Sequence, residues 1–162
     1  MRLIDTHCHL DFDAFSGDLE EIIVRARNVG VTKMITISTK LSDSPILLDL
    51  VSKYDGISCS IGVHPHEAGE EGRTELSDIL KHTSHPKVVG IGETGLDYHY
   101  DTLNSKVQME SFLTHIDAAR ITELPIIIHS RNADVDMMSV LEKEYSKGAF
   151  TGVLHCFTGS LA

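Results

Sequence analysis

Short apolar runs alternate with amphipathic segments along the chain, and this alternation limits its fold more than any other feature. Nearly continuous apolar runs are typical of parallel strands that are covered on both faces, and the intervals between them leave room for a helix. The pattern therefore predicts an α/β fold built from successive βα units. The expected strands are 3–6, 33–38, 57–63, 88–92, 125–128 and 150–154.

Helical periodicity is found in the segments between these runs. Gly30 is a natural stop for the first helix, and Asn132 or Asp134 is a natural cap for the last. The expected helices are 19–29, 104–122 and 135–141, with weaker patterns at 46–51 and 76–80.

Six βα units are fewer than a closed barrel requires. A TIM-type (β/α)8 barrel has eight strands and typically about 250 residues, whereas this chain has 162. We expect residues 1–162 to form a single domain that corresponds to roughly the first six βα units of such a barrel, with its C-terminal part missing. An open sheet of this kind leaves apolar edges uncovered.

Composition and charge narrow the class of protein. The apolar runs are far shorter than the ~20 residues of a membrane helix, and the chain opens without a signal-peptide pattern. We therefore expect a cytoplasmic protein. The net charge of −10 argues against a protein that coats nucleic acid with a broad basic surface. A nuclease is still compatible with this charge, because bound divalent cations supply local positive charge.

The cysteines give no sign of a disulfide framework or a metal site of their own. Cys8, Cys59 and Cys156 are odd in number and show no CxxC spacing. Each lies in an apolar run. The pattern predicts three small, buried side chains in a reducing compartment.

Histidines are concentrated at the ends of the expected strands. In βα folds the carboxyl ends of the strands carry the active site. Four of the six expected strands deliver an imidazole there and one delivers a carboxylate, which chance placement would rarely produce. The strand-end residues are Asp5, His7, His9, Ser38, Thr39, His64, Glu93, His129 and His155.

The first strand ends in the pair His7 and His9. Side chains two residues apart in a strand share a face, so both imidazoles point one way and Cys8 points the other. Two imidazoles at this spacing suit one Zn²⁺ or a similar ion. The alternative is a pair of surface histidines. Asp5 shares the face, either as a carboxylate that orients an imidazole or as an ordinary hydrogen-bonding residue.

Glu93 ends an apolar run, where a carboxylate is costly to bury unless it is paired or bound to a metal. Its two oxygens suit a bridge between two ions ~3.5–4 Å apart, and the alternative is a salt-bridged residue at a strand end. His129 and His155 also end apolar runs. Each alone would fit a core histidine, but their matching positions on neighbouring strands favour metal ligation.

Further candidates lie near these strand ends. His64 and His66 belong to the segment Val-His-Pro-His-Glu, where one of them could touch a scissile phosphate, and His64 is the better candidate. Arg131 is either a phosphate ligand or part of a structural salt bridge. The loop after Glu93 contains Asp97, Tyr98 and His99, which could line the cleft but receive no assigned role. The histidines expected at the surface are His82, His85 and His115.

Five segments in order, IDTHCHLDF, GVHPHE, GETGLDYH, LPIIIHSR and LHCFTGS, resemble those of the TatD family of metal-dependent deoxyribonucleases. The resemblance extends over residues 1–162. That family lies within the superfamily of metal-dependent hydrolases with distorted TIM barrels. The resemblance therefore implies hydrolysis of a phosphodiester bond, typically in DNA, with two divalent ions (Mg²⁺, Mn²⁺ or Zn²⁺).

The same resemblance assigns the ligands. It implies that His7 and His9 hold one ion, that His129 and His155 hold the second, and that Glu93 bridges both.

The remaining expectations concern catalysis and partners. Glu93 and His64 are the expected catalytic residues. Glu93 would hold the divalent ions, which lower the pKa of a bound water towards ~7, and His64 could contact the phosphate. DNA or another phosphodiester is expected to bind at the metal cleft through His64, His66 and Arg131. No membrane and no obligate protein partner are expected.

One family feature is absent from this chain. The family has a further metal-binding aspartate, the best candidate for a general base, in a segment resembling ETD that does not occur here. Two other hypotheses therefore stay open. One is an amidohydrolase that cleaves C–N bonds, although many such enzymes bridge their metals with a carboxylated lysine where this chain has Glu93. The other is a truncated, inactive homologue that binds metal.

Overall fold

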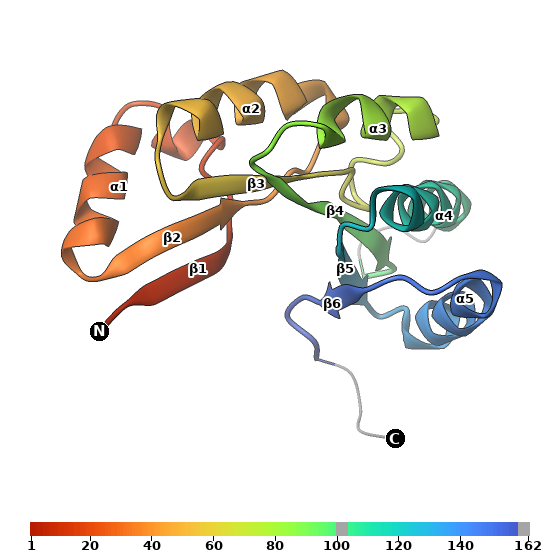
Figure 1. Cartoon of the computed structure of the whole chain (residues 1–162). Coiled ribbons are helices and arrows are strands. Elements are labelled where there is room, and N and C mark those ends of the chain that lie inside the picture. The colour runs from red at the N-terminus through yellow and green to blue at the C-terminus, as the bar shows by residue number, and fades with distance from the viewer. Residues whose placement is uncertain (100–103, 159–162) are drawn as a thin grey trace.

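A computed structural model describes residues 1–99 and 104–158, which form an open, curled sheet with helices on its outer side (Figure 1). The strands lie in the order β1-β2-β3-β4-β5-β6, and each neighbouring pair is parallel. The sheet curls through part of a barrel, with β1 and β6 at its open edges, which confirms the predicted fold. The strands are β1 (Leu3–Cys8), β2 (Val31–Thr36), β3 (Ile57–Ile61), β4 (Val88–Asp97), β5 (Ile126–Arg131) and β6 (Gly152–Leu154).

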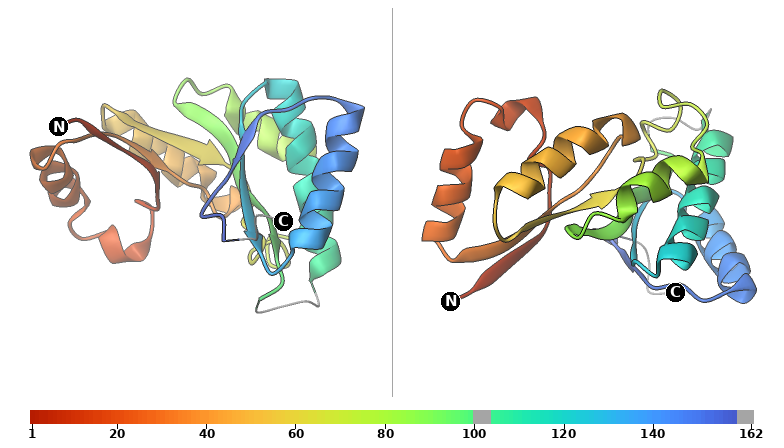
Figure 2. Two further views of the ribbon diagram at one scale, coloured as in Figure 1. Left: turned by 90° about the horizontal axis from the view of Figure 1, so that it is seen from below. Right: turned by 45° about the horizontal axis from the view of Figure 1, so that its top comes forward.

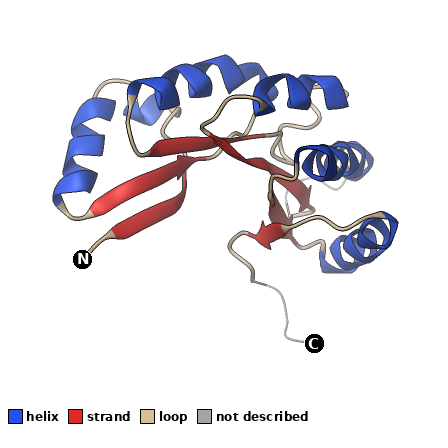
Figure 3. Cartoon of the chain, in the orientation of Figure 1, coloured by secondary structure: helices blue, strands red, loops and turns tan. Residues whose placement is uncertain are grey.

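The helices cover the convex face of the sheet, as the two further views and the colouring by secondary structure show (Figures 2 and 3). The core lies between this face and the helices. Phe112 and Ile116, for example, are fully buried, and each such side chain contributes about 1.5–3 kcal/mol. The helices are α1 (Leu19–Asn28), α2 (Ser44–Lys53), α3 (Leu76–Thr83), α4 (Ser105–Thr122) and α5 (Asp134–Lys147), with short 3₁₀ turns η1 (Asp13–Phe15) and η2 (Leu41–Asp43).

The helix boundaries follow the sequence signals at one end of the chain and depart from them at the other. α1 ends at Asn28, and Gly30 follows with φ +99°, a conformation that favours glycine. The predicted cap of α5 is wrong, because Ala133 holds the N-cap position. Asn132 instead turns the chain out of β5 with φ 54°, and Asp134 lies in the first turn, where a carboxylate stabilises the helix dipole.

β4 is longer than predicted, and this difference reshapes the site. The prediction that a strand ends near Glu93 is wrong, because residues 94–97 continue to pair with β5. The polar and glycine residues 92–95 interrupt the apolar run by which the strand was recognised. As a result, Glu93 lies within the sheet and Asp97 becomes the last residue of the strand.

The open edges of the sheet expose apolar side chains, as expected. Ile4 on β1 is 58% exposed and Val153 on β6 is 54% exposed. Cys59 is buried and Cys8 is half-buried, but Cys156 is exposed, so the prediction of three buried cysteines is wrong. Cys156 follows the edge strand β6, where the chain leaves the sheet.

No helix within residues 1–99 and 104–158 is both long and apolar enough to cross a membrane. The last of the five family-like motifs, LHCFTGS, ends at residues 159 and 160, which lie outside the described residues.

Candidate metal centre

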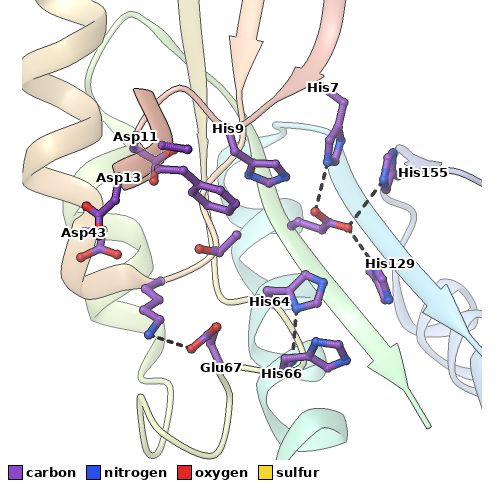
Figure 4. Close-up of a pocket in the computed structure, with 15 residues that line it drawn as sticks. His7, His9, Asp11, Asp13, Asp43, His64, His66, Glu67, His129 and His155 are labelled. Atoms are coloured by element: carbon purple, nitrogen blue, oxygen red, sulfur yellow. Dashed lines mark hydrogen bonds and ion pairs between the residues drawn. The ribbon is translucent and has the colours of Figure 1, made fainter. Parts of the chain in front are cut away.

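The carboxyl ends of the strands open into a cavity of about 770 Å³ (Figure 4). It contains every histidine and carboxylate that the sequence predicted as a metal ligand. Arg131, at the end of β5, is not among the residues that line this cavity. The predicted residues that line it are His7, His9, His64, His66, Glu93, His129 and His155.

β1 delivers His7 and His9 to the cavity. The Nε2 atom of His7 lies 3.1 Å from Oε2 of Glu93. The Nδ1 atom of His9 donates a hydrogen bond to the carbonyl oxygen of Ile37 (3.0 Å), which leaves Nε2 of His9 as the nitrogen with a lone pair. Asp5 accepts a hydrogen bond from the backbone amide of His7 (3.1 Å), so the structure favours an ordinary hydrogen-bonding role for this carboxylate.

Glu93 lies at the centre of the cluster and is only 3% exposed. Its second oxygen, Oε1, lies 2.9 Å from Nδ1 of His129. Burial alone would raise the pKa of Glu93, but the hydrogen bonds to His129 and His7 hold that pKa well below its usual range. Glu93 is therefore a carboxylate whose two oxygens face imidazoles from two different strands.

His129 lies between two carboxylates on β4. Its Nδ1 faces Glu93, and its Nε2 lies 2.9 Å from Oδ2 of Asp97. Burial alone would lower the pKa of His129, but the two carboxylates raise it. Burial alone would raise the pKa of Asp97, but hydrogen bonds from the His99 amide and from His129 lower it. The sequence left Asp97 unassigned, although alternation along a longer β4 would have placed it on the same face as Glu93.

His155 approaches the same cluster from the end of β6. Its ring stacks on that of His7, with centroids 3.5 Å apart and an interplanar angle of 7°. Its Nε2 atom lies 3.9 Å from Oε1 of Glu93. Figure 4 shows dashed lines from His7, His129 and His155 to one shared carboxylate, which is that of Glu93. Burial and the neighbouring His7 lower the pKa of His155, so a ring with a free nitrogen lone pair is favoured.

His64 adds a donor that the sequence assigned to the substrate and not to a metal. Its ring lies 4.6 Å from that of His129, centroid to centroid. Burial lowers the pKa of His64 to about 4. Its Nδ1 atom accepts a hydrogen bond from the backbone amide of His66 (3.2 Å), so the proton of the neutral ring lies on Nε2.

His115 corrects a prediction, because this residue is fully buried and not at the surface. Its Nδ1 donates to the carbonyl oxygen of Ser111 (2.7 Å), and its Nε2 accepts the amide proton of Val63 (3.0 Å). Burial lowers the pKa of His115 to about 4. The ring therefore anchors the backbone next to His64. A histidine on the apolar face of the α4 pattern was the signal for this role.

His82 and His85, near the end of α3, are half-buried rather than fully exposed. His85 has a hydrogen-bond partner on α2, because its Nε2 lies 3.3 Å from Oγ of Ser52.

The donor set fits divalent metal ions. The ligand atoms of His7, His9 and Glu93 lie within 4.8 Å of one another, and so do those of His64, Glu93 and His129. Two ligand atoms that are each about 2.1 Å from one ion are at most about 4.2 Å apart, so little adjustment is needed. Imidazole nitrogens and a carboxylate are ligands that Zn²⁺ and neighbouring transition metals accept.

Known metal-dependent hydrolases and nucleases are similar in sequence to this chain over nearly its whole length. The chain is 39% identical over 158 residues to the uncharacterized metal-dependent hydrolase YabD of Bacillus subtilis, covering 98% of the chain and 62% of that protein. It is 32% identical to the 3'-5' ssDNA/RNA exonuclease TatD of Cronobacter turicensis, and this match covers 98% of the chain and 60% of that protein. The chain thus spans about 60% of the length of these relatives.

The structure resembles the crystal structure of YjjV, a TatD homologue from Escherichia coli, with a TM-score of 0.89 and 33% identity. The match covers 99% of this chain and 62% of that one. The family model described as TatD related DNase matches residues 4–162. The chain therefore belongs to the TatD family of metal-dependent hydrolases.

Proposed function

We propose that this chain is a divalent-metal-dependent hydrolase of phosphodiester bonds, with DNA as its substrate. The observation that carries the proposal is the position of Glu93, whose two oxygens face His7 at 3.1 Å and His129 at 2.9 Å. A carboxylate whose two oxygens face imidazoles on two different strands is well placed to bridge two ions. The relative from Cronobacter turicensis is named an exonuclease of single-stranded DNA and RNA, which supports a nucleic acid substrate.

The proposed ligand sets are those that the resemblance to the TatD family implies. His7 and His9 would hold one ion and His129 and His155 the second, with Glu93 shared, and Mg²⁺, Mn²⁺ or Zn²⁺ as the metal. Such ions supply Lewis-acid charge at the phosphoryl oxygens and generate a hydroxide nucleophile near neutral pH. We propose that residues 1–162 act as one domain in this role.

His64 has a separate role in this proposal. Because its Nδ1 accepts the His66 amide proton, Nε2 carries the proton and is a hydrogen-bond donor. The ring of His64 is neutral, half-buried and next to His129. Such a hydrogen-bond donor suits a non-bridging phosphate oxygen that gains charge in the transition state. His66 lines the same cavity and is the second proposed phosphate contact. Arg131 would reach the substrate only from the rim of the cavity, since it does not line it.

A carboxylate at the proposed bridging position favours phosphodiesters over C–N bonds. The bridging position holds Glu93 and not a lysine. Lys40, which lines the cavity, is paired with Glu67 at 2.8 Å. With a net charge of −10, attraction of a polyanion depends on the metals in the cleft.

The first experiment tests metal binding and turnover together. Isothermal titration with Mn²⁺ and Zn²⁺ is compared for the wild-type chain, Glu93→Gln and the exposed control Glu20→Gln, followed by hydrolysis of end-labelled single-stranded DNA with Mn²⁺ or with a chelator. We expect metal-dependent cleavage that only Glu93→Gln abolishes. Equal metal affinity in wild type and Glu93→Gln contradicts the bridging role.

The other outcomes separate the rival hypotheses. Metal binding without cleavage of DNA or of a cyclic amide would identify an inactive homologue. Cleavage of the cyclic amide alone would identify an amidohydrolase.

A further inference from the structure

We infer that Asp97 is a positioning residue that fixes the orientation of two imidazoles, that of His129 at the proposed second metal and that of His66 on the substrate side. The sequence suggested only that Asp97 could line the cleft and assigned it no role. The inference rests on the proposed metal centre, but its key measurement is made on the protein without metal.

The contacts of the Asp97 carboxylate carry this inference. Its side chain is fully buried. Oδ2 lies 2.9 Å from Nε2 of His129 and 2.9 Å from Nε2 of His66, while Oδ1 accepts the backbone amide proton of His99 at 2.9 Å. One oxygen thus serves two rings whose centroids are 6.3 Å apart. Figure 4 shows His66 and His129 on the same side of the cavity.

The backbone of Asp97 is held as firmly as its side chain. The side chain of Gln108 on α4 is 1% exposed. Its Oε1 accepts the amide proton of Asp97 (2.9 Å), and its Nε2 donates to the carbonyl oxygen of Asp97 (3.1 Å). Both backbone groups of Asp97 are therefore tied to a buried amide, so α4 fixes the end of β4 from which the carboxylate projects.

The chemistry of the carboxylate determines what it does to the rings. An ionised carboxylate only accepts hydrogen bonds, so each ring must present an N–H at Nε2. For His129, this leaves Nδ1 facing Glu93, where the proposed second ion would lie. Such a carboxylate–histidine–metal arrangement holds the ring in one tautomer and makes it a stronger ligand, and its loss typically costs 10–100-fold in metal affinity.

A matched pair of variants tests the role of the charge. Asp97→Asn keeps the size of the side chain but offers one acceptor oxygen and an amide that cannot accept. Asp136→Asn is the control, because Asp136 accepts a hydrogen bond from Tyr98 (2.9 Å) and does not line the cavity. By titration with Mn²⁺ and Zn²⁺, we expect a 10–100-fold weaker affinity for Asp97→Asn and an unchanged affinity for Asp136→Asn. An affinity of Asp97→Asn equal to that of wild type overturns the inference.

A spectroscopic readout separates positioning from a general effect on folding. In ¹H–¹⁵N spectra of the metal-free wild-type chain, the Nε2-bound protons of His129 and His66 should be visible and slow to exchange with water, and both should exchange faster in Asp97→Asn, where one neutral amide oxygen replaces the charged carboxylate. Wild-type spectra without such a proton on His129 overturn the inference even if Asp97→Asn does not fold. If the wild type binds no metal but shows both protons, the proposed function fails while the positioning role stands.

Discussion

Gly95 lies directly opposite His129 across β4 and β5, and a Cβ atom on Gly95 would lie 2.1 Å from the carbonyl oxygen of His129. Glu93 and Asp97 lie two residues on either side of Gly95 and share one face of β4. The missing Cβ lets the backbone of β5 at His129 approach β4 closely, and the ring of His129 reaches both carboxylates. A single glycine thus connects strand pairing with the geometry of the site.

Gly95→Ala should therefore damage both the fold and the site. The backbone at Gly95 has φ +141°, and this strain, together with the overlap with His129, should lower the free energy of unfolding by about 2 kcal/mol or more. Gly17→Ala is the control, since a Cβ there would have nothing within 4 Å. Urea unfolding measures both variants, and equal midpoints would contradict this account of Gly95.

Metal should stabilise the chain through the Glu93 cluster. An ion that binds only the folded state at about 100 times its Kd adds about 2.7 kcal/mol. For a chain of this size, that corresponds to a rise in Tm of roughly 5–10 °C. We expect a chelator to remove the whole rise, and Glu93→Gln to show little of it. Thermal unfolding with and without Zn²⁺ measures the effect, and a metal-independent Tm in the wild type would argue against a metal site.

Metal affinity should increase with pH. The ring of His129 is a metal ligand only when Nδ1 has lost its proton, and the two carboxylates beside it raise its pKa above the ordinary 6.5. Below that raised pKa an ion must displace the proton, so the apparent affinity should grow by up to about tenfold per pH unit and level off above it. Titration calorimetry in two buffers of different ionisation enthalpy counts the released protons. A pH-independent affinity would refute this linkage.

His115 should make stability depend on pH in a defined direction. Its pKa is about 4 in the folded chain, because the ring is fully buried, against an ordinary value of 6.5. Between these values, protonation favours the unfolded chain, so its contribution to the free energy of unfolding falls as the pH falls, by about 1.4 kcal/mol per pH unit.

The variant His115→Gln isolates this contribution. It removes the titrating group and weakens the support of the Val63 amide, so we expect a lower stability at pH 7 but a shallower loss of stability towards pH 5. Urea unfolding of both proteins at the two pH values gives the comparison. Identical slopes would show that His115 does not titrate in this way.

Much of the site was predictable because ligand positions follow strand ends. Each strand carries its own hydrophobic signal, and the residue that follows it lies at the carboxyl edge of the sheet. That rule predicted that His7, His9, His129 and His155 would lie close together, and all four line one cavity in the structure. It missed the full length of β5, which runs on past His129 to Arg131, and of β4, where polar and glycine residues hid the last part of the strand. Because this predicted strand stopped too early, Asp97 was not recognised as a residue on the same face as Glu93.

The order of strands and helices, and with it the edge at which the imidazoles meet, could be predicted from the sequence because hydrophobic periodicity is a local property of the chain. Which side chains contact one another depends on how distant segments pack. His129 reaches carboxylates 36 and 32 residues earlier in the chain, and that contact depends on the register of β4 against β5 and on the absence of a side chain at Gly95. Register is a relation between distant segments, which no local pattern contains.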